Sequence, residues 1–85
     1  MATNGPWAEL VGYLAKELVD DPEAVTVTET IGEGDPDRVR VEVRVDAKDI
    51  GKVVGRDGRT ARALRQVVWA AGNKARKRVI VEILE

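Results

Sequence analysis

The sequence predicts one α+β domain of 85 residues, in the order helix, strand, strand, short helix, longer helix, strand. Three observations lead to this prediction. Apolar residues recur every three or four positions in two stretches, as in amphipathic helices. They alternate with polar residues in two other stretches, as in half-buried strands. A last, nearly continuous apolar run fits one more strand.

The first element is a helix that begins at Pro6, because the missing N–H of proline needs no partner in a first turn. Residues 1–5 before it are expected to be a frayed start. Asp20-Asp21-Pro22 ends the helix. Its apolar stripe, expected to face the core, consists of Trp7, Leu10, Val11, Leu14 and Leu18.

Two alternating stretches, residues 24–31 and 38–45, are expected to pair as a hairpin across a turn-forming cluster. In the first stretch, Val25, Val27 and Ile31 should face the core and the threonines should face solvent. In the second, alternation separates a valine face from a charged face. The valines are Val39, Val41, Val43 and Val45, and the outward residues are Arg38, Arg40, Glu42 and Arg44.

The second half contains two helices and the last strand. Asp46 to Asp49 offer an N-cap for a short helix over residues 50–54. A longer helix is expected over residues 59–71, ended by Gly72-Asn73 and followed by a basic connector at residues 74–78. The last strand should then lie buried beside the others. The core side of the longer helix is predicted to be Ala61, Leu64, Val68 and Ala71.

The composition removes several kinds of chemistry. The chain has no Cys or His, and no Ser occurs in the sequence, so disulfides, thiolate nucleophiles and Ser-His triads are excluded. We therefore expect neither an enzyme nor a cofactor, and any metal site would need carboxylates alone. No apolar run is long enough to cross a membrane and no leader pattern is present, so a cytoplasmic location is expected.

Charge is unevenly distributed along the chain. Residues 1–37 hold one basic and nine acidic residues, a net charge of −8, whereas residues 38–85 hold thirteen basic and six acidic residues, a net charge of +7. Residues 48–78 alone carry ten basic and two acidic residues. Either ordinary surface charge is unevenly spread, or one face of the fold is basic and attracts a polyanion.

Gly55 and Gly58 bracket Arg56 and Asp57 between the two helices. Glycines permit a tight turn and a close approach of the backbone to a ligand. The N–H groups at the start of the next helix would face a ligand over the turn with the positive end of the helix dipole, a setting that suits phosphate. Helix-to-helix turns also contain glycine for steric reasons alone, so the turn is weak evidence by itself.

With its surroundings, this segment resembles the KH family. Residues 50–58, Ile-Gly-Lys-Val-Val-Gly-Arg-Asp-Gly, match the KH hallmark Ile-Gly-x-x-x-Gly-x-x-Gly at every fixed position, and the order of elements is similar to the type II KH arrangement. That arrangement has a mixed three-stranded sheet with helices on one side. Residues 10–22 and the short ending after Leu84 resemble, more narrowly, the KhpA family of small stand-alone bacterial KH proteins.

The resemblance implies that single-stranded RNA binds with its backbone clamped by the glycine loop and its bases in an apolar groove. Asp57 places one unfavourable charge in that loop. For Ile50, Val53 and Val54, packing in the core is the alternative role. The residues expected to bind RNA are Ile50, Gly51, Lys52, Val53, Val54, Gly55, Arg56, Asp57, Gly58, Arg59, Arg62, Lys74, Arg76, Lys77 and Arg78.

The resemblance further implies a role as an RNA chaperone or post-transcriptional regulator. It also implies pairing, either with a second copy or with another KH protein, through the helix after the loop. A protein-interaction module with weak RNA affinity is therefore the alternative function. Trp69 either covers the first helix or anchors such an interface. The residues expected at the interface are Arg62, Arg65, Gln66 and Trp69.

Overall fold

The computed structural model describes residues 5–85; the frayed start predicted from the sequence falls on residues 1–4, outside that range, and on Gly5. The predicted order of elements is confirmed. Short 3-10 turns at Pro22–Ala24, Ala47–Asp49 and Arg56–Gly58 lie between the main elements. The main elements are α1 (Pro6–Leu18), β1 (Thr26–Gly32), β2 (Asp35–Arg44), α2 (Ile50–Val54), α3 (Arg59–Lys74) and β3 (Arg78–Leu84).

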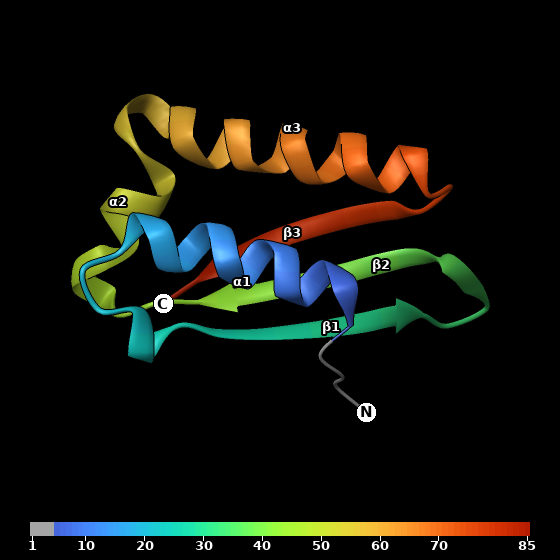
Figure 1. Cartoon of the computed structure of the whole chain (residues 1–85), viewed down its shortest axis with the longest axis horizontal. Coiled ribbons are helices and arrows are strands. Elements are labelled where there is room, and N and C mark those ends of the chain that lie inside the picture. The colour runs from blue at the N-terminus through green and yellow to red at the C-terminus, as the bar shows by residue number, and fades with distance from the viewer. Residues whose placement is uncertain (1–4) are drawn as a thin grey trace.

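The three strands form one mixed sheet, as predicted. Its order is β1-β2-β3, with β1 antiparallel and β3 parallel to the central β2. Helices α1 and α3 lie side by side over one face of this sheet, and the other face is left uncovered by helices (Figure 1). Among residues 5–85, no helix is long and apolar enough to cross a membrane. The fold is therefore the α+β arrangement expected from the sequence.

The core is built on the valine face of β2. The four predicted inward valines of residues 38–45 are all buried, and the charged residues between them point away from the helices. Val11 of α1, Val53 of α2 and Val68 of α3 are also fully buried against this layer. The alternation of valines with charged residues predicted this face correctly. Successive side chains of a strand point to opposite faces of the sheet, and only one face is covered here.

Strand β1 corrects one prediction. Ile31 was expected in the core but is 51% exposed, whereas Glu29 on the same face is buried. Glu29 accepts a hydrogen bond from the backbone N–H of Ala8, at 2.7 Å, and so satisfies a donor in the first turn of α1. The helix therefore begins beside Glu29, and Ile31 lies beyond its end without a helix to cover it.

The predicted stripe of α1 packs against the core, but the most deeply buried face of the helix includes only Val11 of that stripe. Its buried residues are small, and they let the helix lie close to the sheet: a Cβ on Gly12 would come within 3.3 Å of Val27. The larger Leu10, Leu14 and Leu18 are only partly buried and pack against the margin of the core. The residues that face the sheet are Ala8, Val11, Gly12 and Ala15.

Helix α3 continues three residues past its predicted end. Gly72 was expected to stop the helix but is helical and buried. A Cβ on Gly72 would lie 2.9 Å from both the carbonyl oxygen of Lys77 and Cγ2 of Val79, so this glycine allows α3 to approach β3. The left-handed residue after the helix is Arg76, with φ of 61°.

Strand β3 is not enclosed by neighbours, contrary to prediction, because it forms an edge of the sheet. Val79 and Val81 face the helices and are buried, while Ile80 points to the uncovered face and is 43% exposed. An apolar run with one exposed face is compatible with an edge strand as well as with a central one. The exposed edge is important for the site described below.

We expect Glu29→Ala to lower the free energy of unfolding by about 1–3 kcal/mol, because the buried N–H of Ala8 would lose its acceptor. Glu29→Gln keeps an acceptor and loses only the charge that favours a helix N-terminus, so its cost should stay below about 1 kcal/mol. Urea unfolding followed by circular dichroism measures both. Equal costs for the two variants would contradict a capping role for Glu29.

Candidate functional site

The glycine turn between α2 and α3 has a backbone that few residues can adopt. Gly55 has φ of 77° and Gly58 has φ of 73°, both in the region that favours glycine. Thr60 folds back against the turn, so a Cβ on Gly55 would lie 2.2 Å from its Oγ1. Gly55 is therefore required both by its dihedral angle and by lack of space, whereas the space around Gly58 is open.

Asp57 also has a positive φ, of 56°. Asp and Asn adopt this left-handed conformation more readily than other residues with a side chain. The turn thus gives a physical reason for an acidic residue at a position where the expected phosphate contact would favour lysine. Asp57 fits the backbone conformation while it weakens the positive potential of the turn.

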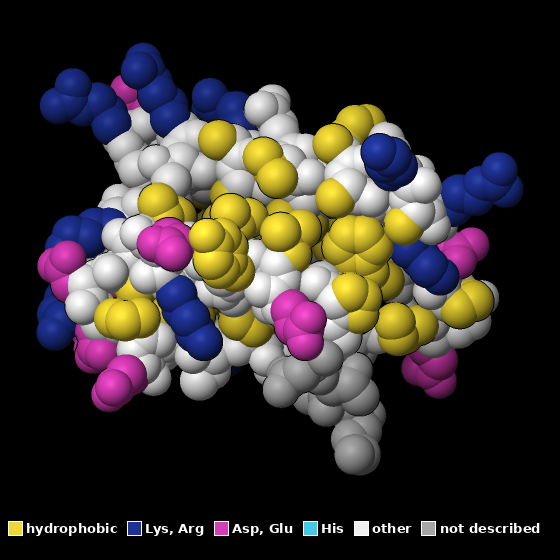
Figure 2. All heavy atoms as spheres, in the orientation of Figure 1, with side chains coloured by type: hydrophobic (Ala, Val, Ile, Leu, Met, Phe, Trp, Pro, Cys, Tyr) yellow, Lys and Arg dark blue, Asp and Glu magenta, His cyan; other side chains and the backbone are white. Residues whose placement is uncertain are grey.

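The first turn of α3 presents its backbone donors beside this glycine turn. No side chain caps the helix at Gly58; the N–H of Arg59 donates to the carbonyl oxygen of Arg56, and the N–H groups that follow it in the first turn of α3 have no side-chain cap. Arg56 and Arg59 flank these groups, and both are exposed. The space-filling view shows Lys and Arg side chains gathered at this end of the molecule (Figure 2). Together these donors suit an anion such as a phosphate group.

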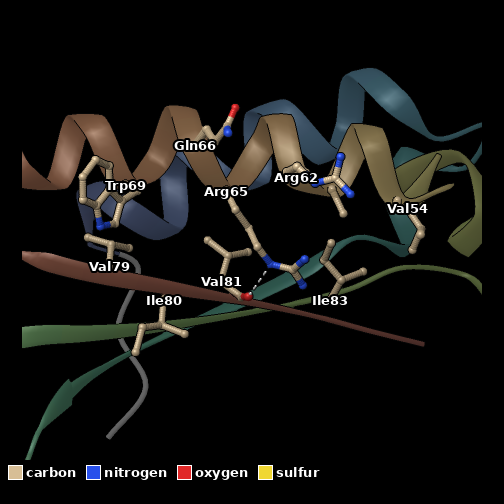
Figure 3. A pocket seen from close by; sticks show the side chains of 11 residues that line it. Val54, Arg62, Arg65, Gln66, Trp69, Val79, Ile80, Val81 and Ile83 are labelled. Atoms are coloured by element: carbon tan, nitrogen blue, oxygen red, sulfur yellow. Dashed lines mark hydrogen bonds between the residues drawn. The ribbon is translucent and has the colours of Figure 1, made fainter. Parts of the chain in front are cut away.

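A groove leads away from the glycine turn between α3 and the free edge of β3 (Figure 3). Aliphatic side chains of β3 form one wall, and long polar side chains of α3 form the other. None of the lining residues is acidic. The lining residues are Val54, Gly58, Ala61, Arg62, Arg65, Gln66, Trp69, Val79, Ile80, Val81 and Ile83.

Arg65 crosses the middle of this groove. Its Nε donates a hydrogen bond of 3.2 Å to the carbonyl oxygen of Val81 on the free edge of β3. This contact holds the guanidinium against the strand, with its other nitrogen atoms near Ile83 (Figure 3). Since alternate residues of a strand present their backbone groups to the same side, Val79 and Ile83 also direct theirs toward the groove.

The structure brings several predicted site residues together. Val54, Gly58 and Arg62, which were expected to bind RNA, line the groove together with Val79 and Ile80 of β3. The predicted partner-interface residues Arg62, Arg65, Gln66 and Trp69 lie in the same groove rather than on a separate surface. The helical spacing alone placed them on one side of α3, but it could not show that the edge of β3 lies beneath that side.

Trp69 does not cover the first helix, which was one of its two predicted roles. It lies over the edge of β3 near Val79 and is 58% exposed (Figure 3). The residues of α3 that border Leu14 and Leu18 of α1 instead include Ala63 and Val67. Helix α3 therefore has two exposed sides, one toward the groove and one toward α1.

Other predicted site residues serve the fold. Val53 is completely buried, so its side chain is unavailable to a ligand, and Ile50 packs against the core. Lys52 forms an ion pair with Asp20 and lies 3.7 Å from Oδ1 of the buried Asp49. The hydrogen bond with Asp20 raises the pKa of Lys52 and lowers the pKa of Asp20. Lys52 is thus turned toward the connection after α1.

Asp49 was not recognised from the sequence as a positioning residue. Its Oδ2 accepts a hydrogen bond of 3.1 Å from the backbone N–H of Asp21, although its side chain is fully buried. This contact ties the start of α2 to the connection between α1 and β1. The anchor helps to hold α2, and with it the glycine turn, in a fixed position.

The basic connector lies at the opposite end of α3 from the glycine turn. Lys77 forms an ion pair with Asp37, at 2.9 Å, and Arg78 forms one with Asp35, so both are partly neutralised by the hairpin. Lys74 and Arg76 are exposed, and no carboxylate within residues 5–85 forms an ion pair with either. Exposed positive charge therefore lies at both ends of α3.

Comparison with known proteins agrees with this geometry. The family model described as KhpA/KhpB, KH domain matches residues 8–83. The chain belongs to this KH family. An RNA-binding protein KhpA of Aquifex aeolicus is 51% identical over 77 residues, covering 91% of this chain and 94% of that protein. The KhpA of Clostridium perfringens is 49% identical over 76 residues, covering 89% and 97%.

Solved structures share the fold of this KhpA/KhpB family member over most of its length. Aquifex aeolicus Era bound to GDP and aluminium fluoride superimposes with a TM-score of 0.63 at 16% identity, covering 92% of this chain and 30% of Era. Era in complex with a segment of 16S ribosomal RNA gives a TM-score of 0.55 at 20% identity, covering 92% and 29%. At such low identity the likeness concerns the fold alone.

We expect Gly55→Ala to cost about 2–6 kcal/mol of stability, the sum of about 1–3 kcal/mol for a side chain at φ 77° and ψ 173° and about 1–3 kcal/mol for an overpacked contact with Thr60. Gly58→Ala should cost only the strain of a left-handed residue, about 1–2 kcal/mol, because the space around Gly58 is open. Chemical unfolding of both variants measures the difference. If Gly58→Ala proved the more damaging change, the described packing of Thr60 against Gly55 would be wrong.

Proposed function

We propose that this chain binds single-stranded RNA without catalysis, with the glycine turn holding the RNA backbone and the groove beside β3 receiving the bases. The observation that carries the proposal is the continuity of the turn with a groove that contains arginines and no acidic side chain. Its relatives bear the name RNA-binding protein, and the family match covers residues 8–83. The names of the relatives and the family match both support RNA as the ligand.

Backbone phosphate would sit over the first turn of α3. There the uncapped N–H groups donate hydrogen bonds, and Arg56 and Arg59 supply positive charge. Glycine at position 58, around which the space is open, lets the nucleotide chain approach the peptide backbone more closely than a side chain there would allow. Asp57 reduces the attraction, so the turn binds RNA less tightly than its arginines alone would allow.

The groove favours unpaired bases over a duplex. Its floor is aliphatic and lies against the free edge of β3, where backbone N–H and C=O groups can meet the polar edges of a base. A base must leave its stack to reach these groups, which single-stranded RNA permits at low cost. Arg65 stands where a base would lie and can contact it or shift to admit it.

A small RNA-binding domain without catalytic groups acts by occupying or remodelling its ligand. We therefore assign this chain a role as an RNA chaperone or post-transcriptional regulator in the cytoplasm. The absence of Cys, His and Ser from the sequence supports a non-catalytic role, since the common nucleophile and base pairs need them. Recognition of unpaired nucleotides is the step on which such a role depends.

We expect the double variant Arg56→Gln, Arg59→Gln to bind a short labelled RNA at least ten-fold more weakly in low salt. Each lost phosphate contact should reduce the slope of log affinity against log salt by about 0.7. The variant Asp57→Asn should act in the opposite direction, because Asn keeps the left-handed conformation and removes the repulsion. Fluorescence anisotropy across a salt series measures all three proteins.

The matched control is Arg38→Gln, Arg44→Gln, which removes two charges from the uncovered face of the sheet. It should leave both affinity and salt slope nearly unchanged, while circular dichroism confirms that every variant is folded. Equal losses in both double variants would show that net charge, rather than the glycine turn, determines binding. Absence of wild-type binding at low salt would refute RNA binding itself.

A second candidate function is pairing with another copy or with another KH protein. The observation in its favour is the apolar seam between α1 and α3, where Leu14, Leu18, Ala63 and Val67 come together. Val67 is 54% exposed, and hydrophobic side chains form a band along this seam in the space-filling view (Figure 2). Such a surface gains from being covered by a partner.

We expect the wild type to sediment as a dimer and Val67→Glu to sediment as a monomer, because a charge buried at an interface without a partner is costly. Ile31→Glu is the matched control, since Ile31 is exposed to a similar degree but lies away from the seam. Analytical ultracentrifugation distinguishes the outcomes. A monomeric wild type, or a dimer that survives Val67→Glu, would rule out self-pairing through the seam.

A further inference from the structure

Trp69 stands at the end of the groove farthest from the glycine turn. It follows Arg59 by ten residues along α3, a distance of roughly 15 Å. A KH glycine loop clamps about four nucleotides, so a longer RNA that follows the groove would continue toward Trp69. The indole is 58% exposed and lies over the start of β3, near Val79 (Figure 3).

We propose that Trp69 is a stacking platform for an additional base of single-stranded RNA, beyond the nucleotides held at the glycine turn. This inference rests on the proposed RNA binding and extends it by one subsite. An indole offers a flat aromatic face on which any base can stack. The platform would therefore add affinity without adding strong sequence preference.

The surroundings of Trp69 favour a nucleotide over a peptide. Arg65 lies on the glycine-turn side of the indole, Lys74 is the last residue of α3, and Arg76 lies in the connector that follows. None of the residues lining the groove is acidic, so the path to Trp69 attracts a polyanion along its whole length. A protein interface anchored on Trp69 would have to accommodate these cations.

A subsite at Trp69 also gives a role to two positive charges that lie far from the glycine turn. Lys74 and Arg76 are too far along α3 to contact a phosphate at Gly58, yet they remain accessible at the end of the chain's most basic segment. A longer RNA that passes Trp69 would approach the end of α3 at which they lie. The two ends of the groove would then hold the backbone, and the aliphatic floor between them would hold the bases.

The test compares Trp69→Phe with Trp69→Leu on RNAs of four and eight nucleotides. Phe keeps an aromatic face, whereas Leu keeps only apolar bulk. We expect Trp69→Leu to bind the longer RNA at least five-fold more weakly than the wild type, and Trp69→Phe to retain most of the affinity. The loss should be smaller for the shorter RNA, which does not need to reach Trp69.

A spectroscopic readout reports on stacking directly. The chain has two tryptophans, Trp7 and Trp69, so a Trp7→Phe background leaves Trp69 as the only indole. We expect the longer RNA to quench its fluorescence, and an RNA with an abasic site at one of its outer positions to quench it less. The background variant must give the wild-type circular dichroism spectrum.

Each other outcome overturns the inference. If the wild type binds the longer RNA but Phe and Leu variants have equal affinity and no quenching occurs, stacking is refuted while RNA binding stands. If Trp69→Leu converts a dimer to a monomer and leaves RNA affinity unchanged, Trp69 belongs to a protein interface. If the wild type binds neither RNA, the proposed function fails together with this subsite.

Discussion

The candidate site depends on how closely α3 packs against the sheet. At Gly72 the helix approaches β3 so closely that even a Cβ would collide with Lys77 and Val79. Leu64 and Val68 bury the rest of the same face, and α3 and β3 diverge from their connection toward the glycine turn (Figure 1). The close approach at Gly72, which has no side chain, thus fixes both the angle of α3 to the sheet and the opening of the groove.

The other end of α3 is fixed by the turn before it. Three residues with positive φ follow α2 almost in succession, and the fully buried Val53 anchors α2 in the core. Asp49, which is buried and bonded to the Asp21 backbone, adds a second anchor. Strain in the turn is therefore held by packing on both sides, so its N–H groups keep one direction before any ligand arrives.

Much of this arrangement could be predicted from the sequence because it depends on local patterns. Alternating valines identified β2 and its buried face, and two glycines around a charged pair identified the turn. The pattern could not show that Glu29 caps α1, since the residue it bonds is distant in sequence. Nor could it show that Gly72 serves a close approach rather than a helix end, because the two neighbours responsible, Lys77 and Val79, come against it only when β3 packs under α3.

Trp69 illustrates the same limit at the site. Its spacing placed it correctly with Arg62 and Gln66 on one side of α3, but the identity of the surface opposite them depends on the topology of the sheet. Because β3 is parallel to β2 and lies at the edge, its free backbone groups face these residues. The residues that were expected to form a protein interface therefore lie above a strand edge whose backbone groups are free.

The two exposed sides of α3 bear on whether RNA binding and pairing can coexist. The groove side carries Arg62, Arg65 and Trp69, whereas the seam side carries Ala63 and Val67 beside α1. A partner on the seam would leave the groove and the glycine turn uncovered. Pairing through the seam would then place two grooves in one assembly, and the second RNA contact would form at a high effective concentration. The charge of Asp57 predicts a modest RNA affinity at each glycine turn, which is compatible with an assembly that contacts RNA at two turns.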